Sequence, residues 1–465
     1  MVLQAISDRL GGVVSNVSGL FSDPVIRLGV TGLSRAGKTV FTTGLVANLL
    51  HRGRMPQLTG AARIEAAFLQ PQPDMTLPRF DYEGHLAALT GDAPRWPDST
   101  RAVSELRLSF RVAPAGLFAS FQGTRTLHVD IIDYPGEWLL DLGLLDKTYA
   151  DWSDDVLTRL AKRDQAADFR ATALAEDASL PFDEARAQAL AASFTAYLQV
   201  ARAAGYADCT PGRFLLPGDL AGSPVLTFAP LPRPASTARR SLWTEMERRF
   251  EGYKARVVQP FFRQHFARID RQVVLVDVLD AIHRGPQALE DLRRTMADVL
   301  AAFRPGRNGW LTALLGGKHV ERILFAATKA DHLHHNQHPR LTAITTALLT
   351  EAVARADFSG ARTAAMSLAS YRATVEDTIT RGDDALEAVR GRLLSTGQQA
   401  AMYAGELPSD PARLLSPARE GAMGWLDAEF SLMGFAPARS TQAPGEGPPH
   451  IRLDRAAQFL IGDML

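Results

Sequence analysis

Two glycines, a lysine and a threonine fall within the eight residues Gly32–Thr39, near the start of the chain. A short apolar run, Ile26–Thr31, precedes this segment, and Val40–Leu50, which has a helical composition, follows it. This order of strand, glycine-rich loop and helix is typical of a P-loop, because glycines let backbone N–H groups approach an anion and the helix N-terminus adds positive charge. The segment therefore predicts binding of a nucleoside triphosphate together with Mg²⁺.

The side chains of this loop have expected roles. Lys38 reaches the β- and γ-phosphates, and the Thr39 hydroxyl is a hard oxygen ligand suited to Mg²⁺. The guanidinium of Arg35 is expected over the phosphates, either as an arginine finger for transition-state charge or as a solvated source of positive potential. The predicted nucleotide contacts from this part of the chain are Gly32, Ser34, Arg35, Ala36, Gly37, Lys38, Thr39 and Val40.

A second apolar run, Leu127–Ile132, leads into Asp133-Tyr134-Pro135-Gly136. An aspartate at the end of a strand parallel to the P-loop strand orients a Mg²⁺-bound water, so Asp133 is a predicted metal ligand, and Gly136 is predicted to offer its N–H to the γ-phosphate. Glu137 stands where a glutamine often orients the attacking water. Glu137 is a candidate for positioning that water, but its negative charge would repel the γ-phosphate, so slow turnover is expected.

The segment Trp96–Thr100 lies just before the alternating strand Ser104–Val112. A threonine that enters the strand before the Asp133 strand is where switch I is found in GTPases. Thr100 is therefore predicted to complete the coordination of Mg²⁺ when the γ-phosphate is bound. Ser99 competes for this role, and a plain turn is the alternative for the segment.

A third apolar strand, Ile323–Ala327, runs into Thr328-Lys329-Ala330-Asp331. The Asp331 carboxylate can accept hydrogen bonds from the ring N–H and the exocyclic amine of guanine, which adenine cannot offer, and the Lys329 stem can lie over the base. Asparagine is commoner than threonine at the Thr328 position, and an ordinary strand-to-helix turn with a capping aspartate is the alternative. After the last predicted strand, Thr363–Leu368, the small residues Ala369 and Ser370 are predicted to let the backbone approach the guanine carbonyl.

The order of these motifs resembles the G-domain of translation-factor-class GTPases and, more nearly, the YcjX-like family of bacterial GTPases. The second resemblance rests on Gly32–Thr39, Asp133–Trp138, Thr328–Asp331 and the terminal His450–Ala457, so it spans almost the whole chain. It implies a GTP-binding protein linked to the stress response of Gram-negative bacteria. The place of Arg35 is also similar to that of the internal arginine finger of guanylate-binding large GTPases.

These motifs require an α/β frame, and the predicted fold is a P-loop NTPase G-domain, a mostly parallel sheet flanked by helices, over residues 23–137 and 271–374. The next buried strand, Val273–Val278, begins far beyond Asp133, so residues 138–270 are predicted to form a large helical insertion domain. Its position is expected to respond to the γ-phosphate, because it follows the Asp133–Gly136 turn directly. Two apolar stripes indicate its helices: Leu190, Phe194, Tyr197, Leu198 and Ala201 in one, and Met246, Phe250, Tyr253 and Val257 in the other.

Three further segments complete the predicted organisation. Residues 51–95 form an insertion in the switch I region, and residues 1–22 form an N-terminal helix that either docks on its own domain or lies on a membrane surface. Residues 375–465 are predicted to be a helical C-terminal region, because Leu386, Val389 and Leu393 have helical spacing.

Composition excludes several classes of function. Lys+Arg and Asp+Glu both number 51, so no basic surplus predicts a nucleic-acid partner. The single cysteine, Cys209, excludes an internal disulfide. No apolar run approaches the length of about 18 residues that a transmembrane helix requires, and the N-terminus does not resemble a signal peptide. We expect a cytoplasmic protein, with peripheral association with the inner membrane and a membrane-associated protein partner left open.

The sequence thus predicts an enzyme that hydrolyses GTP to GDP and phosphate with Mg²⁺ and acts as a nucleotide-dependent switch. One alternative is a nucleotide-gated scaffold with negligible hydrolysis, which Glu137 favours and Arg35 disfavours. Another is an ATP-using small-molecule kinase, which would need an acceptor pocket and an arginine-rich lid and would make Thr328–Asp331 accidental.

Overall fold

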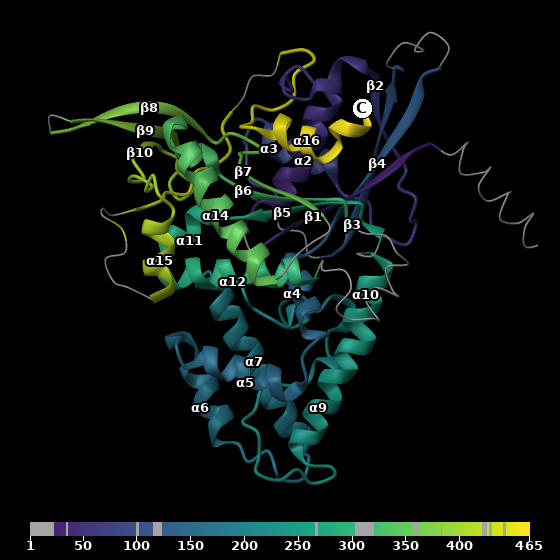
Figure 1. Cartoon of the computed structure of the whole chain (residues 1–465), viewed down its shortest axis with the longest axis vertical. Coiled ribbons are helices and arrows are strands. Elements are labelled where there is room, and N and C mark those ends of the chain that lie inside the picture. The colour runs from purple at the N-terminus through teal and green to yellow at the C-terminus, as the bar shows by residue number, and fades with distance from the viewer. Residues whose placement is uncertain are drawn as a thin grey trace, which may run out of the picture.

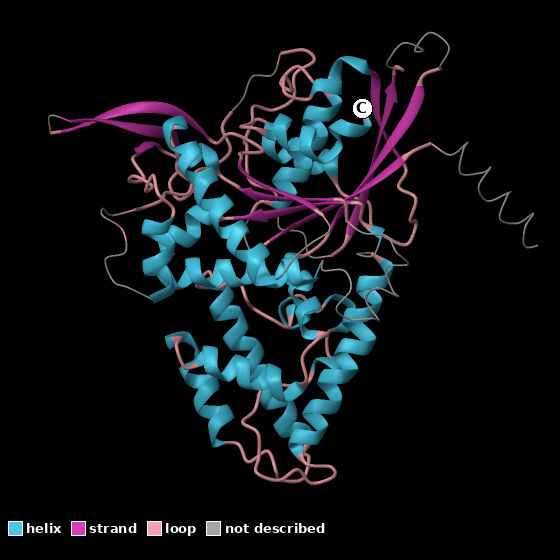
Figure 2. Cartoon of the chain, in the orientation of Figure 1, coloured by secondary structure: helices cyan, strands magenta, loops and turns pink. Residues whose placement is uncertain are grey.

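The computed structural model describes residues 23–33, 36–98, 102–114, 123–265, 268–302, 320–356, 361–382, 384–420, 426, 430–439 and 443–465. A seven-stranded sheet with the order β2-β3-β4-β1-β5-β6-β7 forms its centre (Figure 2). The strands are β1 (Val25–Gly32), β2 (Ile64–Gln70), β3 (Ser104–Val112), β4 (Arg125–Asp133), β5 (Arg271–Val276), β6 (Arg322–Ala327) and β7 (Arg362–Ser367). Only β3 runs against the others, so the fold is the mostly parallel α/β sheet of a P-loop NTPase.

The central strands carry apolar runs because both faces of the sheet are covered. In β5, Val273 and Leu275 pack in one apolar core, while Val274 and Val276 pack in the other. The first core lies under α2 (Lys38–Leu50), α3 (Tyr82–Thr90) and α16 (Leu453–Ile461). The second lies against α11 (Val278–Arg284), α12 (Pro286–Ala302) and α14 (His338–Ala356), as Figure 1 shows.

Between β4 and β5 the chain is helical and forms the lower part of the molecule in Figure 1. Its helices are α4 (Gly136–Leu140), α5 (Tyr149–Leu160), α6 (Ala167–Ala175), α7 (Glu184–Ala203), α8 (Gly212–Leu215), α9 (Leu242–Tyr253) and α10 (Gln259–Gln264). Both predicted apolar stripes are buried, and Trp152 of α5 stacks on Phe250 of α9 with ring centroids 5.1 Å apart. This core is continuous with the core beneath α11, α12 and α14, so the helices are packed on the sheet domain.

The prediction of a helical region over residues 375–465 is wrong for its first part. Three antiparallel strands occupy it, β8 (Thr374–Arg381), β9 (Asp384–Arg392) and β10 (Gln399–Met402), in the order β10-β9-β8. The helical spacing of the leucines and valine was coincidental: Leu386 pairs across the hairpin with Ile379, and Gly382 takes a positive φ of 66° in the turn. Helices follow only later, as α15 (Ala412–Glu420) and α16.

Three smaller predictions remain to be compared with the structure. The strand predicted over Val273–Val278 ends at Val276, because the Asp277 side chain accepts the Asp280 N–H at 3.1 Å and begins α11. The segment 51–95 contributes edge strand β2 and helix α3. The N-terminal helix expected over residues 1–22 lies outside the described residues. Within the described ranges, no helix combines the length and the apolar character that a membrane span requires.

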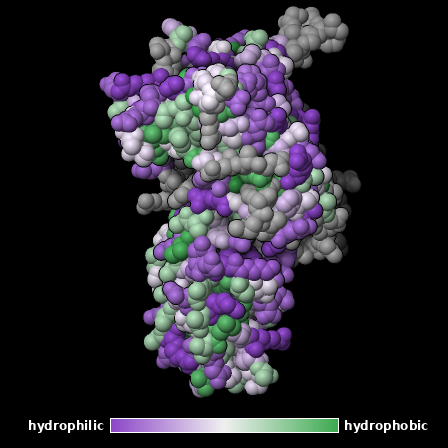
Figure 3. All heavy atoms as spheres, turned by 90° about the vertical axis from the view of Figure 1, so that its left-hand side faces the viewer, coloured by the Kyte–Doolittle hydropathy of each residue, from purple (hydrophilic) through white to green (hydrophobic). Residues whose placement is uncertain are grey.

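Hydrophilic and hydrophobic residues are interspersed over the face seen in Figure 3, on both the sheet domain and the helical part below it. Single exposed apolar side chains on a surface are ordinary.

Candidate functional site

The loops after β1, β6 and β7 meet at the carboxyl edge of the sheet, where they line a cavity of about 400 Å³. That volume is in the range of small-molecule sites, and the carboxyl edge is where open parallel sheets bind their ligands. The described lining residues are Ala36, Gly37, Lys38, Thr39, Val40, Trp96, Pro97, Thr328, Lys329, Asp331, His332, Ala369, Ser370, Tyr371, Leu394, Gly434 and Phe435. The cavity therefore joins the predicted phosphate loop to the predicted base-reading loops.

The two glycines of the loop, Gly32 and Gly37, lie close to the start of α2. Gly37 takes the left-handed conformation, with φ 79°, immediately before the helix. Lys38 Nζ donates to the Gly32 carbonyl at 3.4 Å, and a Cβ on Gly32 would lie 2.9 Å from Lys38 Cγ. The Thr39 hydroxyl donates to the Asp98 carbonyl at 3.4 Å. Glycine at both positions is thus required by backbone conformation and close approach, as the sequence predicted for this loop.

Four of the predicted site positions cannot be placed. Ser34, Arg35, Ser99 and Thr100 lie outside the described residues, so the expected arginine finger and the expected switch I ligand stay predictions.

The Asp133 turn packs against the P-loop strand without lining the cavity. Asp133 is the last residue of β4, is buried, and pairs in register with Val30 of β1. Gly136 begins α4, and a Cβ on it would lie only 2.0 Å from the Gly32 carbonyl oxygen. No residue larger than glycine fits here without moving the two loops apart. The Asp133 carboxylate at the end of β4 and the Thr39 hydroxyl in the first turn of α2 are the hard oxygen donors that Mg²⁺ prefers.

Glu137 is buried and forms an ion pair with Arg202 of α7, with Oε1 and Nη2 2.8 Å apart. The pair compensates the negative charge of Glu137, which is predicted to lie near the γ-phosphate. Beside it, the guanidinium of Arg213 lies 3.4 Å from the ring centre of Trp138. The first turn of α4 is therefore attached to the helical part of the chain through charge and ring contacts.

Asp141, at the end of α4, makes the same connection through hydrogen bonds. Its carboxyl accepts the Gly212 N–H at 2.8 Å and the Tyr253 hydroxyl at 2.5 Å. Burial of the group raises its pKa to about 7, although both hydrogen bonds act in the opposite direction. The contact of the end of α4 with α8 and α9 thus contains a carboxyl whose pKa lies near neutral pH.

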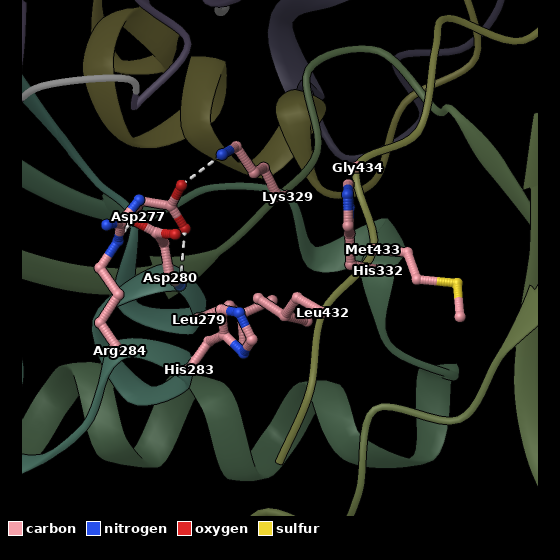
Figure 4. Close-up of a pocket in the computed structure, with 10 residues that line it drawn as sticks. All are labelled: Asp277, Leu279, Asp280, His283, Arg284, Lys329, His332, Leu432, Met433 and Gly434. Carbon is pink, nitrogen blue, oxygen red and sulfur yellow. Dashed lines mark hydrogen bonds and ion pairs between the residues drawn. The ribbon is translucent and has the colours of Figure 1, made fainter. Parts of the chain in front are cut away.

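The loop after β6 holds Thr328, Lys329 and Asp331 in defined places. Lys329 has a positive φ of 60° and forms an ion pair with Asp277, which Figure 4 shows. Burial by itself would lower the pKa of Lys329, but the charge of Asp277, the hydrogen bond to it and the charges of Asp280 and Asp331 together outweigh burial, and the pKa is raised. Asp331 is buried at 3% exposure, and its Oδ2 accepts the Ala373 N–H at 2.7 Å. Burial would raise the pKa of Asp331, yet contacts with His332 and this N–H lower it, so the carboxylate is held ionised.

Ala369 and Ser370, which follow β7, both line the cavity. Ala369 exchanges two backbone hydrogen bonds with Ile451, 3.1 and 2.8 Å long, just before α16. A Cβ on Gly44 of α2 would lie 2.5 Å from the Ser370 carbonyl oxygen. The loop is therefore fixed between α2 and the C-terminal part of the chain.

Several lining residues were not predicted as contacts. Trp96 Nε1 donates to the Phe435 carbonyl at 2.8 Å, and the Trp96 ring meets the edge of Tyr371 at 6.2 Å. Trp96 and Tyr371 lie next to predicted motifs, so proximity in sequence was a signal for them. Leu394 and Phe435 reach the cavity from the region after β9, and no local pattern marks them. A second cavity of about 350 Å³ adjoins the first and shares Lys329, His332 and Gly434 (Figure 4).

Comparison with protein families matches residues 26–465 to the YcjX-like family. A relative from Shewanella oneidensis named "Ras-like GTPase YcjX" is 35% identical over 96% of this chain and 95% of its own length. A relative of the same name from Escherichia coli is 38% identical over 95% of this chain and 96% of its own length. The matches cover all the motifs above, from the phosphate loop to the C-terminal helix. The chain belongs to the YcjX-like family.

Proposed function

We propose that the chain binds GTP and Mg²⁺ in the 400 Å³ cavity and hydrolyses GTP to GDP and phosphate. The observation that carries the proposal is that one cavity joins Lys38 and Thr39 to Asp331 and Ser370. A phosphate-binding loop alone is compatible with ATP or GTP. Asp331 and the relatives' printed name, "Ras-like GTPase", favour the guanine nucleotide.

In this proposal the base lies between Lys329 and the loop of Ala369 and Ser370. The Asp331 oxygen that does not accept from Ala373 is the acceptor for the guanine N–H groups, because the carboxylate is already ionised and held in place. Thr328 lines the same cavity and occupies the position usually held by asparagine.

At the other end, Lys38 and the N–H groups of the loop hold the β- and γ-phosphates, while Thr39, Asp133 and, from switch I, Thr100 hold Mg²⁺. When bound, Mg²⁺ would supply positive charge that neutralises the negative charge developing on the phosphates. Gly136 offers its N–H to the γ-phosphate, and its close approach to Gly32 supports this. Arg35 remains the proposed arginine finger.

Glu137 is the proposed group that positions the attacking water. Its ion pair with Arg202 reduces the repulsion from the γ-phosphate but also restrains the side chain, which favours slow turnover. The same restraint is the observation that supports the second candidate function, a scaffold that binds GTP and hydrolyses it negligibly.

We further propose that residues 138–270 form the unit that reports the bound nucleotide to a protein partner. The contacts of Glu137 and Asp141 with α7, α8 and α9 support this, because they begin directly after the turn that would contact the γ-phosphate. The family resemblance extends the proposal to a cytoplasmic switch in the bacterial stress response. Peripheral association with the inner membrane is an open part of it, and balanced charge argues against a nucleic-acid partner.

The test measures nucleotide affinity and phosphate release for the full chain with and without Mg²⁺. We expect Lys38→Ala to lose GTP binding and Asp331→Ala to lose at least about hundredfold of the preference for GTP over ATP, since two hydrogen bonds to a carboxylate are removed. Asp168→Ala, which changes an exposed aspartate on α6, is the matched control. Competition of ATP as effective as that of GTP in the wild type would contradict the guanine assignment. Binding of GTP without multiple-turnover phosphate release would contradict GTP hydrolysis and favour the second candidate function, a nucleotide-gated scaffold.

A further inference from the structure

Two histidines follow the base-reading loop and face the β8–β9 hairpin. His335 Nδ1 lies 3.0 Å from Oε2 of Glu376 on β8, and His334 Nε2 lies 3.9 Å from the same oxygen. Within the described part of the chain, these three side chains form the one group of histidine, cysteine and acidic residues whose ligand atoms all lie within 4.8 Å of one another. They come from two separate elements, so the fold and not a local sequence run brings them together.

We propose that His334, His335 and Glu376 bind a divalent transition-metal ion of the zinc type. Ligand atoms about 2.1 Å from a tetrahedral centre are separated by about 3.4 Å, and the measured separations of 3.0 and 3.9 Å bracket that value. Two imidazoles and a carboxylate are a donor set that zinc accepts, whereas Mg²⁺ and Ca²⁺ prefer oxygen alone. The site is therefore chemically distinct from the proposed Mg²⁺ position at Thr39 and Asp133.

Further groups around the three ligands support the site. His334 Nδ1 is buried and lies 3.4 Å from Oε2 of Glu387 on β9, so when Nε2 binds the ion, Nδ1 meets a carboxylate that is not itself a ligand. Metal-binding histidines commonly have such a carboxylate on the second nitrogen, which fixes the tautomer and the ring. Asn336 Nδ2 donates to both oxygens of Glu387 at 2.6 Å and holds this carboxylate in place.

The three proposed ligands differ in how much of each side chain is exposed. The His334 side chain is 13% exposed, that of Glu376 is 37% exposed and that of His335 is 62% exposed. One side of the site is thus fixed in the protein, while the other is open to an entering ion and to water as a remaining ligand.

Other histidines of the same tract have different uses. His338 Nε2 lies 2.8 Å from the Ala330 carbonyl oxygen, and His332 packs beside Phe435 in the nucleotide cavity. The two remaining histidines, His334 and His335, face the hairpin carboxylates Glu376 and Glu387. Binding of the ion would join the loop after Asp331 to the hairpin and stabilise the attachment of the hairpin to the sheet domain.

The test uses the full chain without an affinity tag. Equilibrium dialysis against micromolar ZnCl₂, followed by elemental analysis, gives the zinc bound per chain. We expect the wild type to hold one zinc ion more than His334→Ala/His335→Ala, with at least about tenfold weaker binding in the double variant. His51→Ala, which removes an exposed histidine after α2, is the matched control and should behave as the wild type. Equal zinc in all three proteins, or none in the wild type, would overturn the site.

A second variant guards against misfolding of the double variant. Glu376→Gln keeps the size and shape of the side chain but removes the anionic ligand, and far-ultraviolet circular dichroism verifies its fold. Saturating ZnCl₂ should raise the Tm of the wild type and of His51→Ala but not that of Glu376→Gln. The same rise in all three proteins would show that zinc binds elsewhere and would refute the assignment.

Discussion

The ion pair between Glu137 and Arg202 connects the turn after β4 to helix α7, and Arg202→Ala tests whether that connection matters. Exposed pairs contribute about 0–1 kcal/mol, whereas breaking a buried pair costs about 3–5 kcal/mol because a charge is left unpaired. The Glu137 side chain is 8% exposed, but that of Arg202 is 32% exposed and solvent screens it in part. We therefore expect the free energy of unfolding to fall by about 2 kcal/mol.

The assay is a double-mutant cycle with Glu137→Gln, in which urea unfolding is followed by circular dichroism. Glutamine fills the space of Glu137 without a charge, so Arg202→Ala should cost clearly less in the Glu137→Gln background than in the wild type. Arg170→Ala, at an exposed position on α6, is the control and should change stability by less than about 0.5 kcal/mol.

The same variants test the role of the pair in nucleotide binding. With Arg202 removed, the buried charge of Glu137 is no longer compensated, so affinity for GTP should fall more than affinity for GDP, and Glu137→Gln should restore the ratio. Additive stability changes together with an unchanged ratio of GTP to GDP affinity would refute the reasoning. That outcome would mean that the ion pair is a surface contact with no bearing on the turn.

Three further predictions concern other parts of the structure. Burial raises the pKa of Asp141 to about 7 from its ordinary 3.8. Between these two pH values the carboxyl is ionised in the unfolded chain but protonated in the folded one, so the free energy of unfolding falls as the pH rises to about 7. The wild type should lose about 3 kcal/mol relative to Asp141→Asn between pH 5 and pH 8, and parallel urea-unfolding curves over that range would contradict this. Gly37→Ala should weaken nucleotide binding and lower the free energy of unfolding by about 1–2 kcal/mol, because alanine is strained at a φ of 79°. The cost is limited to this strain, since a Cβ at position 37 would meet no atom within 4 Å. Unchanged affinity in a fluorescence titration would argue against strain in the loop. Trp152→Ala should lower the free energy of unfolding by about 4 kcal/mol, since its ring is 1% exposed and stacked on Phe250; a loss below about 1 kcal/mol in urea would mean that the helical core is loosely packed.

Much of the sheet was predictable because its strands are buried on both faces and read as apolar runs. The strand expected over Ser104–Val112 has those bounds, and β1 ends at Gly32, where the glycine-rich segment begins. The β8–β9 hairpin was not predictable in this way, because it is polar, partly exposed and lacks a continuous apolar run. Its apolar residues happened to match helical spacing, and only pairing with the opposite strand distinguishes the two structures.

Contacts between distant parts of the chain were the other limit. Trp96 bonds to the Phe435 carbonyl across 339 positions, and Glu137 pairs with Arg202 across a whole run of helices. No spacing rule relates such residues, because their meeting depends on how complete elements pack. Sequence motifs could therefore identify the loops of the cavity but not the side chains that close it.

The two appendages of the sheet domain are attached beside different motifs of the proposed nucleotide site. The β8–β9 hairpin is attached beside the proposed base-reading loop, where the Ala373 N–H and the Thr374 hydroxyl donate to Asp331. The helical segment is attached beside the turn proposed to contact the γ-phosphate, through Glu137 and Asp141. GTP and GDP have the same base and differ only in the γ-phosphate. If the proposed site is correct, the helical segment can therefore respond to which nucleotide is bound, whereas the hairpin can respond only to whether the cavity is filled.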